Sequence, residues 1–189
     1  MQTATSIFAA ITLSIFCLDL VVAQSAEDKK LYAEFADAMD KYGYTWEPHK
    51  VKTEDLWNLT IFRITGKKGK PTQTQSSDKY PVLAQHGATD SALGWAIHGT
   101  IRPTMPMKLV DHGYDVWLGN ARGVIYSDSN DRDGTWTDAE RWNFTWADLG
   151  TYDIPAVVTK ILEVTAKDKV TMMGHSQGTS QIFYALAKN

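Results

Sequence analysis

The sequence lacks the marks of several large classes of protein. It has a single cysteine, Cys17, which lies in an N-terminal segment that we expect to be removed, so no disulfide is expected in the mature fold. Its basic residues form no stripe and the formal net charge is -3, so no nucleic-acid partner is expected. The remaining composition, 43% hydrophobic over 189 residues, fits one globular domain with a sizeable core.

Residues 1–23 resemble a secretory signal peptide. A short apolar run, residues 7–17, precedes the small residues Val21-Val22-Ala23 at the positions that signal peptidase reads. The run is too short for a membrane span, and Asp19 interrupts the segment. We therefore expect the mature chain to start near Gln24, to enter the secretory pathway and to have no transmembrane span.

Two sequons fit that route. Asn58-Leu59-Thr60 and Asn143-Phe144-Thr145 both match the pattern for N-glycosylation. Asn58 and Asn143 are therefore candidate glycosylation sites, although either match could also arise by chance.

The chemistry is carried by residues 169–187. The apolar residues 170–173 predict a strand and the residues after Gly178 predict a helix, with a tight turn between them at Gly174-His175-Ser176-Gln177-Gly178. The turn matches Gly-x-Ser-x-Gly, in which the serine has strained backbone angles and the glycines Gly174 and Gly178 give its neighbours room. Ser176 is the predicted nucleophile, and the N–H of Gln177 is a predicted oxyanion donor. A chance match is the alternative, and the strand and helix on either side argue against it.

A second donor is predicted beside this turn. Residues 81–85 predict a short buried strand that runs directly into His86-Gly87-Ala88. Glycine at such a junction lets the backbone approach a neighbouring loop or a ligand closely, and the N–H of Ala88 is placed to be the second oxyanion donor. His86 could act as a catalytic base, but a histidine here more often braces the loop through hydrogen bonds.

The order of the remaining segments predicts an α/β fold. Residues 24–45 contain an amphipathic helix, and residues 46–189 form the main domain. Within that domain we expect an antiparallel hairpin (46–52 and 56–64), an exposed connection (67–79), a helix (105–112) stopped by Gly113, a strand (114–118), a loop (127–137) and a helix (151–162). Alternating strands and helices predict a mostly parallel sheet covered on both faces and preceded by the hairpin.

Two further features allow more than one interpretation. Arg122 could bind an anion, but an arginine that ties loops together is the favoured interpretation. Four aromatic residues lie close together in sequence, Trp136, Trp142, Phe144 and Trp146. They could line an apolar substrate entry, although packing beneath the loop is the simpler explanation. No metal site or cofactor is predicted.

Several blocks together resemble one family, the acid lipases of the gastric and lysosomal type. They are Gln85-His86-Gly87, the segment Gly113-Tyr114-Asp115-Val116-Trp117-Leu118-Gly119-Asn120-Ala121-Arg122-Gly123, the segment Tyr152-Asp153-Ile154-Pro155-Ala156, and Gly174-His175-Ser176-Gln177-Gly178-Thr179. The resemblance extends from about Trp46 to the last residue. It implies an α/β-hydrolase that cleaves triglycerides or cholesteryl esters at a lipid–water interface, outside the cell or in the lysosomal lumen.

The chain departs from the family pattern at three points. Ala88-Thr89 stands where the family has bulky apolar residues, and Ala121 stands where it has serine. The thirteen residues after Ser176 contain no Asp, Glu or His, whereas α/β-hydrolases place both remaining triad residues after the serine. We therefore expect a partial hydrolase domain without its C-terminal strands, later helices, lid and triad Asp and His. A non-catalytic secreted lipid-binding remnant and an esterase or thioesterase of the same fold are the alternative functions.

Overall fold

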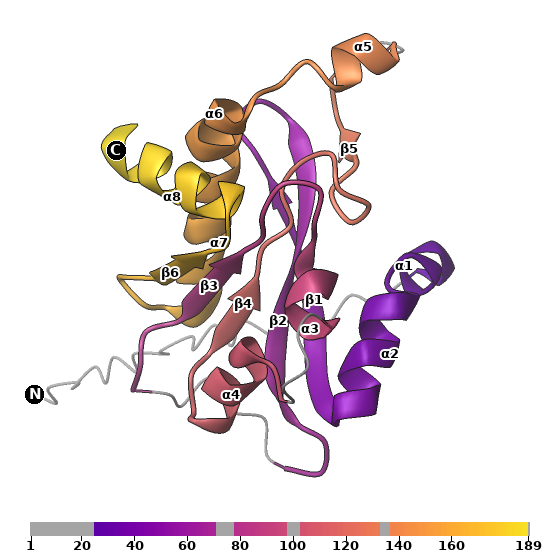
Figure 1. Ribbon diagram of the computed structural model, residues 1–189, viewed down its shortest axis with the longest axis vertical. Coiled ribbons are helices and arrows are strands. Elements are labelled where there is room, and N and C mark those ends of the chain that lie inside the picture. Colours follow the sequence, from indigo (N-terminus) through magenta and orange to yellow (C-terminus); the bar gives the residue numbers. More distant parts are fainter. Residues whose placement is uncertain (1–24, 71–77, 98–102, 133–136, 189) are drawn as a thin grey trace, which may run out of the picture.

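The computed structural model describes residues 25–70, 78–97, 103–132 and 137–188 (Figure 1). Its helical elements are α1 (Ala26–Leu31), α2 (Ala33–Tyr42), α3 (Ala92–Ile97), α4 (Met105–Asp111), α5 (Asp138–Arg141), α6 (Trp146–Asp148), the π-helical turn η1 (Leu149–Asp153), α7 (Ile154–Thr165) and α8 (Gln177–Lys188). Its strands are β1 (Tyr44–Lys52), β2 (Trp57–Lys67), β3 (Val82–Gln85), β4 (Val116–Leu118), β5 (Ser129–Asn130) and β6 (Thr171–Gly174). The expected signal peptide and Cys17 lie outside the described residues.

One mixed sheet organises the fold, with the strand order β1-β2-β4-β3-β6 and β5 beside β2. The hairpin of β1 and β2 is antiparallel, as predicted, and β2 also runs antiparallel to β4. From β4 onward the strands β4, β3 and β6 are parallel. The predicted α/β class and the mostly parallel arrangement after the hairpin are confirmed.

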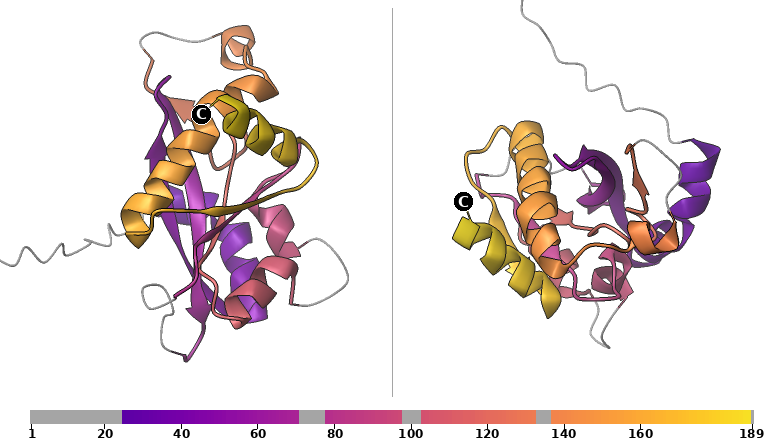
Figure 2. Two further views of the ribbon diagram at one scale, coloured as in Figure 1. Left: turned by 90° about the vertical axis from the view of Figure 1, so that its left-hand side faces the viewer. Right: turned by 90° about the horizontal axis from the view of Figure 1, so that it is seen from above.

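Helices cover both faces of the sheet, as the two views of Figure 2 show. Successive residues of a strand point to opposite faces. In β4, for example, Trp117 packs with Val157 and Ile161 of α7, whereas Val116 and Leu118 pack on the side of α2, α3 and α4. β4 is therefore apolar on both sides, which explains why its sequence is a continuous hydrophobic run.

Three predicted segments differ from the structure. The N-terminal helix is interrupted at Tyr32, where the buried ring packs edge-on against Phe62 at a centroid distance of 5.3 Å. The predicted loop 127–137 contains the short strand β5, which extends the sheet beside β2. The helix expected from residue 151 is continuous with the wider turn η1, and α7 begins at Ile154 with proline in its first turn.

The parallel strands place three loops side by side. The carboxyl ends of β3, β4 and β6 lie at one edge of the sheet, so the segments that follow them at residues 86–90, 119–127 and 175–177 are neighbours. In open α/β sheets this edge is where ligands bind. The described residues contain no helix of sufficient length and hydrophobicity to cross a bilayer.

Candidate active site

Ser176 occupies a sharp bend between β6 and α8. Its φ of 52° lies in the left-handed region, which a serine enters only at a cost. A Cβ on Gly174 would lie 2.5 Å from the backbone nitrogen of Thr179, and a Cβ on Gly178 would lie 2.4 Å from the carbonyl oxygen of His86. Both positions therefore require glycine, and the bend leaves Ser176 exposed to solvent.

The loop after β3 lies directly against this bend. Gln85 is paired with Gly174 in the parallel register, and the N–H of His175 donates to the Gln85 carbonyl at 3.0 Å. A Cβ on Gly87 would lie 3.0 Å from the Cβ of Ser176 and 3.2 Å from the His175 carbonyl oxygen. The predicted close approach at Gly87 is confirmed, and the loop it approaches is the one that carries Ser176.

Two backbone N–H groups flank Ser176. Gln177 follows it as the first residue of α8, and Ala88 follows Gly87 in the adjacent loop. Among the described residues neither N–H has a hydrogen-bond acceptor. The next residue, Thr89, also has a positive φ, 57°, so both loops contain a strained non-glycine residue. The geometry leaves two donors available to a bound group.

His86 braces the loop and is not placed to act as a base. Its Nδ1–H donates to the Gly87 carbonyl at 2.7 Å, and its Nε2 accepts from the N–H of Ala121 at 3.0 Å. That pattern requires the neutral Nδ1–H tautomer. Burial lowers the pKa of His86 below its usual value, although the Gly87 carbonyl and Asp90 act in the opposite direction. Because the Gly87 carbonyl and the Ala88 N–H belong to one peptide unit, His86 fixes the direction of that N–H.

Among the described residues, no base is in position beside Ser176. Within the described part of the chain, its hydroxyl has no hydrogen bond to an imidazole or a carboxylate. The neighbouring His175 is exposed, and its ring lies edge-on to Trp95 at a centroid distance of 6.4 Å. The described residues also contain no group of three or more His, Cys, Asp or Glu that could hold a metal ion.

Hydrogen bonds tie the segment after β4 to the loop after β3, to the start of α3 and to β2. The side chain of Asn120 accepts from the N–H of Ala92 at 2.8 Å and donates to the Thr60 carbonyl at 2.8 Å. The next residue, Ala121, donates to His86. Alanine in place of the family's serine therefore leaves this bond intact, because the donor is the backbone.

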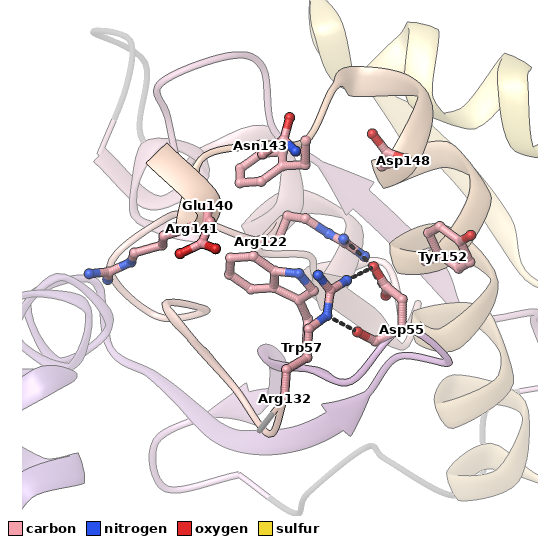
Figure 3. A pocket seen from close by; sticks show the side chains of 10 residues that line it. Asp55, Trp57, Arg122, Arg132, Glu140, Arg141, Asn143, Asp148 and Tyr152 are labelled. Carbon is pink, nitrogen blue, oxygen red and sulfur yellow. Dashed lines mark hydrogen bonds and ion pairs between the residues drawn. The ribbon is translucent and has the colours of Figure 1, made fainter. Parts of the chain in front are cut away.

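Arg122 is the centre of a buried ion-pair network (Figure 3). Its guanidinium contacts Asp153 at 2.7 Å and Asp55 at 2.5 Å. The backbone N–H of Arg122 also donates to the Asp153 carboxylate, at 2.9 Å. Burial raises the pKa of Asp153 to about 6, and the pair with Arg122 offsets only part of that change. Arg132 also donates to Asp55, at 3.1 Å. The favoured interpretation of Arg122 as a tie between loops is confirmed: it joins the hairpin turn, the segment after β4 and the start of α7.

The aromatic segment divides into a packed part and an exposed part. Phe144 lies edge-on to the buried Trp57 at 5.5 Å, so packing explains it. By contrast, Trp142 and Trp146 are 55% and 46% exposed. Trp136 lies outside the described residues.

One positioning contact gave no recognisable sequence signal. The amide of Gln85 donates to Gln181 at 3.0 Å inside the protein, and this bond joins β3 to α8. Gln181 is one helical turn from Gln177 on the inner side of α8.

A strained serine between two obligatory glycines, at the carboxyl edge of a parallel sheet and against a His-Gly loop, is the arrangement of α/β-hydrolases. The family described as "alpha/beta hydrolase fold" matches residues 80–189, and the "Partial alpha/beta-hydrolase lipase region" matches residues 35–99. The chain belongs to the α/β-hydrolase family. Its resemblance to the acid lipases is also confirmed by the curated relatives it matches.

Three relatives illustrate the similarity. "Lipase 1" of Drosophila melanogaster is 42% identical over 76% of this chain and 30% of its own length. "Lipase member K" of Mus musculus is 35% identical over 88% of this chain and 41% of its own length. "Gastric triacylglycerol lipase" of Rattus norvegicus is 36% identical over 78% and 36%, respectively. This α/β-hydrolase chain thus spans less than half the length of these relatives.

A solved structure supports the fold alone. An esterase from Pyrococcus furiosus superposes with a TM-score of 0.55 at 22% identity, over 79% of this chain and 49% of the esterase.

Proposed function

We propose that this chain provides the nucleophile and the oxyanion site of a serine hydrolase that cleaves lipid esters. The observation that carries the proposal is the contact between Gly87 and Ser176, since it brings an exposed hydroxyl beside the unpaired N–H groups of Ala88 and Gln177. A carbonyl oxygen placed between those donors would gain negative charge during attack, and the two N–H groups would stabilise it.

The reaction follows from these groups. The Ser176 oxygen attacks the ester carbonyl carbon while its proton passes to a base, and the carbonyl electrons move to the oxygen held by Ala88 and Gln177. Collapse of this intermediate expels the alcohol, which takes up the proton, and leaves an acyl group on Ser176. Water then attacks the acyl group and releases the acid. The base is not among the described residues, so the complete reaction requires an imidazole from outside them.

Lipid esters are the substrate class best supported by the relatives. Two of them are named as lipases and a third as a triacylglycerol lipase. We further propose action at a lipid–water interface in a secretory or lysosomal compartment, and the apolar leader at residues 1–23 is consistent with that route. An esterase or thioesterase with small substrates and a non-catalytic lipid binder are the competing functions.

Covalent labelling tests the nucleophile. The purified chain is treated with a fluorophosphonate in the presence of imidazole, which can act as the base, and the adduct is located by mass spectrometry. The proposal predicts an adduct on Ser176 that Ser176→Ala abolishes and Ser180→Ala, an exposed serine on α8, preserves. Labelling of another serine, or equal labelling of all three proteins, would contradict it. Faster turnover of long-chain than of short-chain esters under these conditions separates lipid ester hydrolysis from the esterase alternative.

A further inference from the structure

Asn143 stands at the apex of a tight turn on the surface. The N–H of Phe144 donates to the Trp142 carbonyl at 2.8 Å, which closes a three-residue turn around Asn143. Asn143 is exposed, and its side chain has no hydrogen-bond partner among the described residues. The third sequon residue, Thr145, is exposed as well. Nothing in this turn would obstruct a sugar on the amide nitrogen.

The other sequon has a different environment. Asn58 lies within β2, where it is paired with Lys52 on one side and Ser129 on the other. Its amide donates to Asp131 at 2.7 Å, and Asp131 forms an ion pair with Lys52 at 2.7 Å. A sugar on Asn58 would meet the ion pair of Asp131 and Lys52 and the two strands that pair with β2 at this residue.

An aromatic surface lies next to Asn143. One edge of the Trp142 ring is seated on Gly123, where an added Cβ would be 2.7 Å from it, and the ring centroid is 5.9 Å from that of Phe144. The indole is thus held at its inner edge while 55% of the residue remains exposed. A pyranose ring has a face of C–H groups, and such a face packs well on an exposed aromatic ring.

Polar side chains also lie near Asn143. Asn143 lines the pocket of about 170 Å³ drawn in Figure 3, together with Glu140, Arg141 and Asp148. Glu140 and Asp148 already accept hydrogen bonds from Thr137 and Thr145, and Arg141 pairs with Asp128. A carboxylate oxygen has further lone pairs, which can accept from sugar hydroxyl groups. The surroundings of Asn143 therefore offer both an apolar face and polar partners.

We infer that Asn143, and not Asn58, carries an N-linked glycan whose first N-acetylglucosamine packs on the indole of Trp142. The inference requires entry into the secretory pathway but does not depend on the reaction at Ser176. The glycan would cover an exposed apolar side chain and keep this part of the surface in water, so a lipid surface would have to approach the protein elsewhere.

Occupancy is tested by translating the full chain with endoplasmic-reticulum microsomes. Enzymatic removal of the glycan in ¹⁸O water converts the modified Asn to a heavy Asp, which mass spectrometry locates. We expect the label on Asn143 only, with the mobility shift abolished by Asn143→Gln and retained by Asn58→Gln. Modification of Asn58 instead, an unmodified translocated chain, or a chain left outside the microsomes would overturn the inference. Each result is independent of whether Ser176 reacts.

Packing on Trp142 is tested by hydroxyl-radical oxidation of glycoprotein from a eukaryotic host that adds high-mannose chains. Three forms are compared: the intact glycoprotein, a form trimmed to the first sugar, and a form with the glycan removed. We expect Trp142 to be protected several-fold in the first two and not in the third, because the first sugar is sufficient. Trp146, which is 46% exposed, serves as the control and should not change. Equal oxidation of Trp142 in all three forms would overturn the packing.

Discussion

Gly87 and Ser176 are in contact across the ends of β3 and β6: a methyl group on residue 87 would lie 3.0 Å from the serine Cβ. This spacing sets the distance between the Ala88 N–H and the serine hydroxyl. It also makes the geometry of the proposed site sensitive to a single methyl group.

We therefore expect Gly87→Ala to lower both the stability and the reactivity of Ser176. The methyl group would also meet the His175 carbonyl oxygen at 3.2 Å, so the two loops must separate, at a cost of about 1–3 kcal/mol. Gly69→Ala is the control: its φ of 73° is strained for alanine, but no atom lies within 4 Å of the added Cβ. Both variants should lose stability in urea unfolding, and only Gly87→Ala should lose fluorophosphonate labelling. Undiminished labelling of Gly87→Ala would show that the contact does not matter.

The strain at Ser176 predicts a conflict between stability and function. Its φ of 52° favours glycine, so Ser176→Gly should gain about 1 kcal/mol in free energy of unfolding while losing the nucleophile. Ala166→Gly, at the left-handed C-cap of α7, should gain a similar amount and keep labelling. Ser180→Gly, inside α8, should lose about 0.5–1 kcal/mol. If Ser176→Gly is destabilised as Ser180→Gly is, the bend is not strained.

The buried His86 predicts a dependence of stability on pH. Its folded pKa is below the unfolded value of about 6.5, so the unfolded state binds more protons between the two values. The free energy of unfolding should therefore keep its full value above about pH 6.5. Below that pH it should fall as the pH decreases, by up to about 1.4 kcal/mol per pH unit. His86→Gln should not show this dependence of stability on pH. The variant should nevertheless be less stable at pH 7.5, because the hydrogen bonds of His86 to Gly87 and Ala121 are altered. The exposed His112 provides the control His112→Gln. Urea midpoints at several pH values measure this, and equal slopes in all three proteins would refute it.

The network at Arg122 predicts a large difference between two arginines. Arg122→Met leaves Asp153 buried without its partner, so we expect a loss of about 3–5 kcal/mol. Arg141→Met removes only a partly exposed pair with Asp128, so the expected loss is at most about 1 kcal/mol. Unfolding midpoints in urea distinguish the two, and similar losses would mean that the Arg122 network contributes little.

Much of this fold was predictable from the sequence, because its signals are local. The hairpin, β3 and the bend at Ser176 each follow from apolar runs and glycines that need particular backbone geometry. The break at Tyr32 was not predictable, since it depends on packing against Phe62 from a distant strand.

The candidate site likewise contains features that the sequence predicts and features that only the structure shows. Gly87 was expected to approach a loop, but only the structure shows its contact with Ser176. The bond between Gln85 and Gln181 joins residues 96 positions apart, and glutamine alone gives no sign of such pairing. Sequence thus identified residues whose role depends on their own backbone, and missed those whose role depends on a remote partner.

The most direct test of Ser176 as the nucleophile is imidazole-dependent turnover of p-nitrophenyl butyrate by the chain and by Ser176→Ala. Oxyanion donors without a base give only about 10³–10⁴-fold over water, so added imidazole should reveal the serine. We predict a rate that increases with imidazole beyond the solution reaction, is absent in Ser176→Ala, and is accompanied by an acyl adduct on Ser176. Equal rates for the two proteins at every imidazole concentration, with no acyl adduct, would contradict the account.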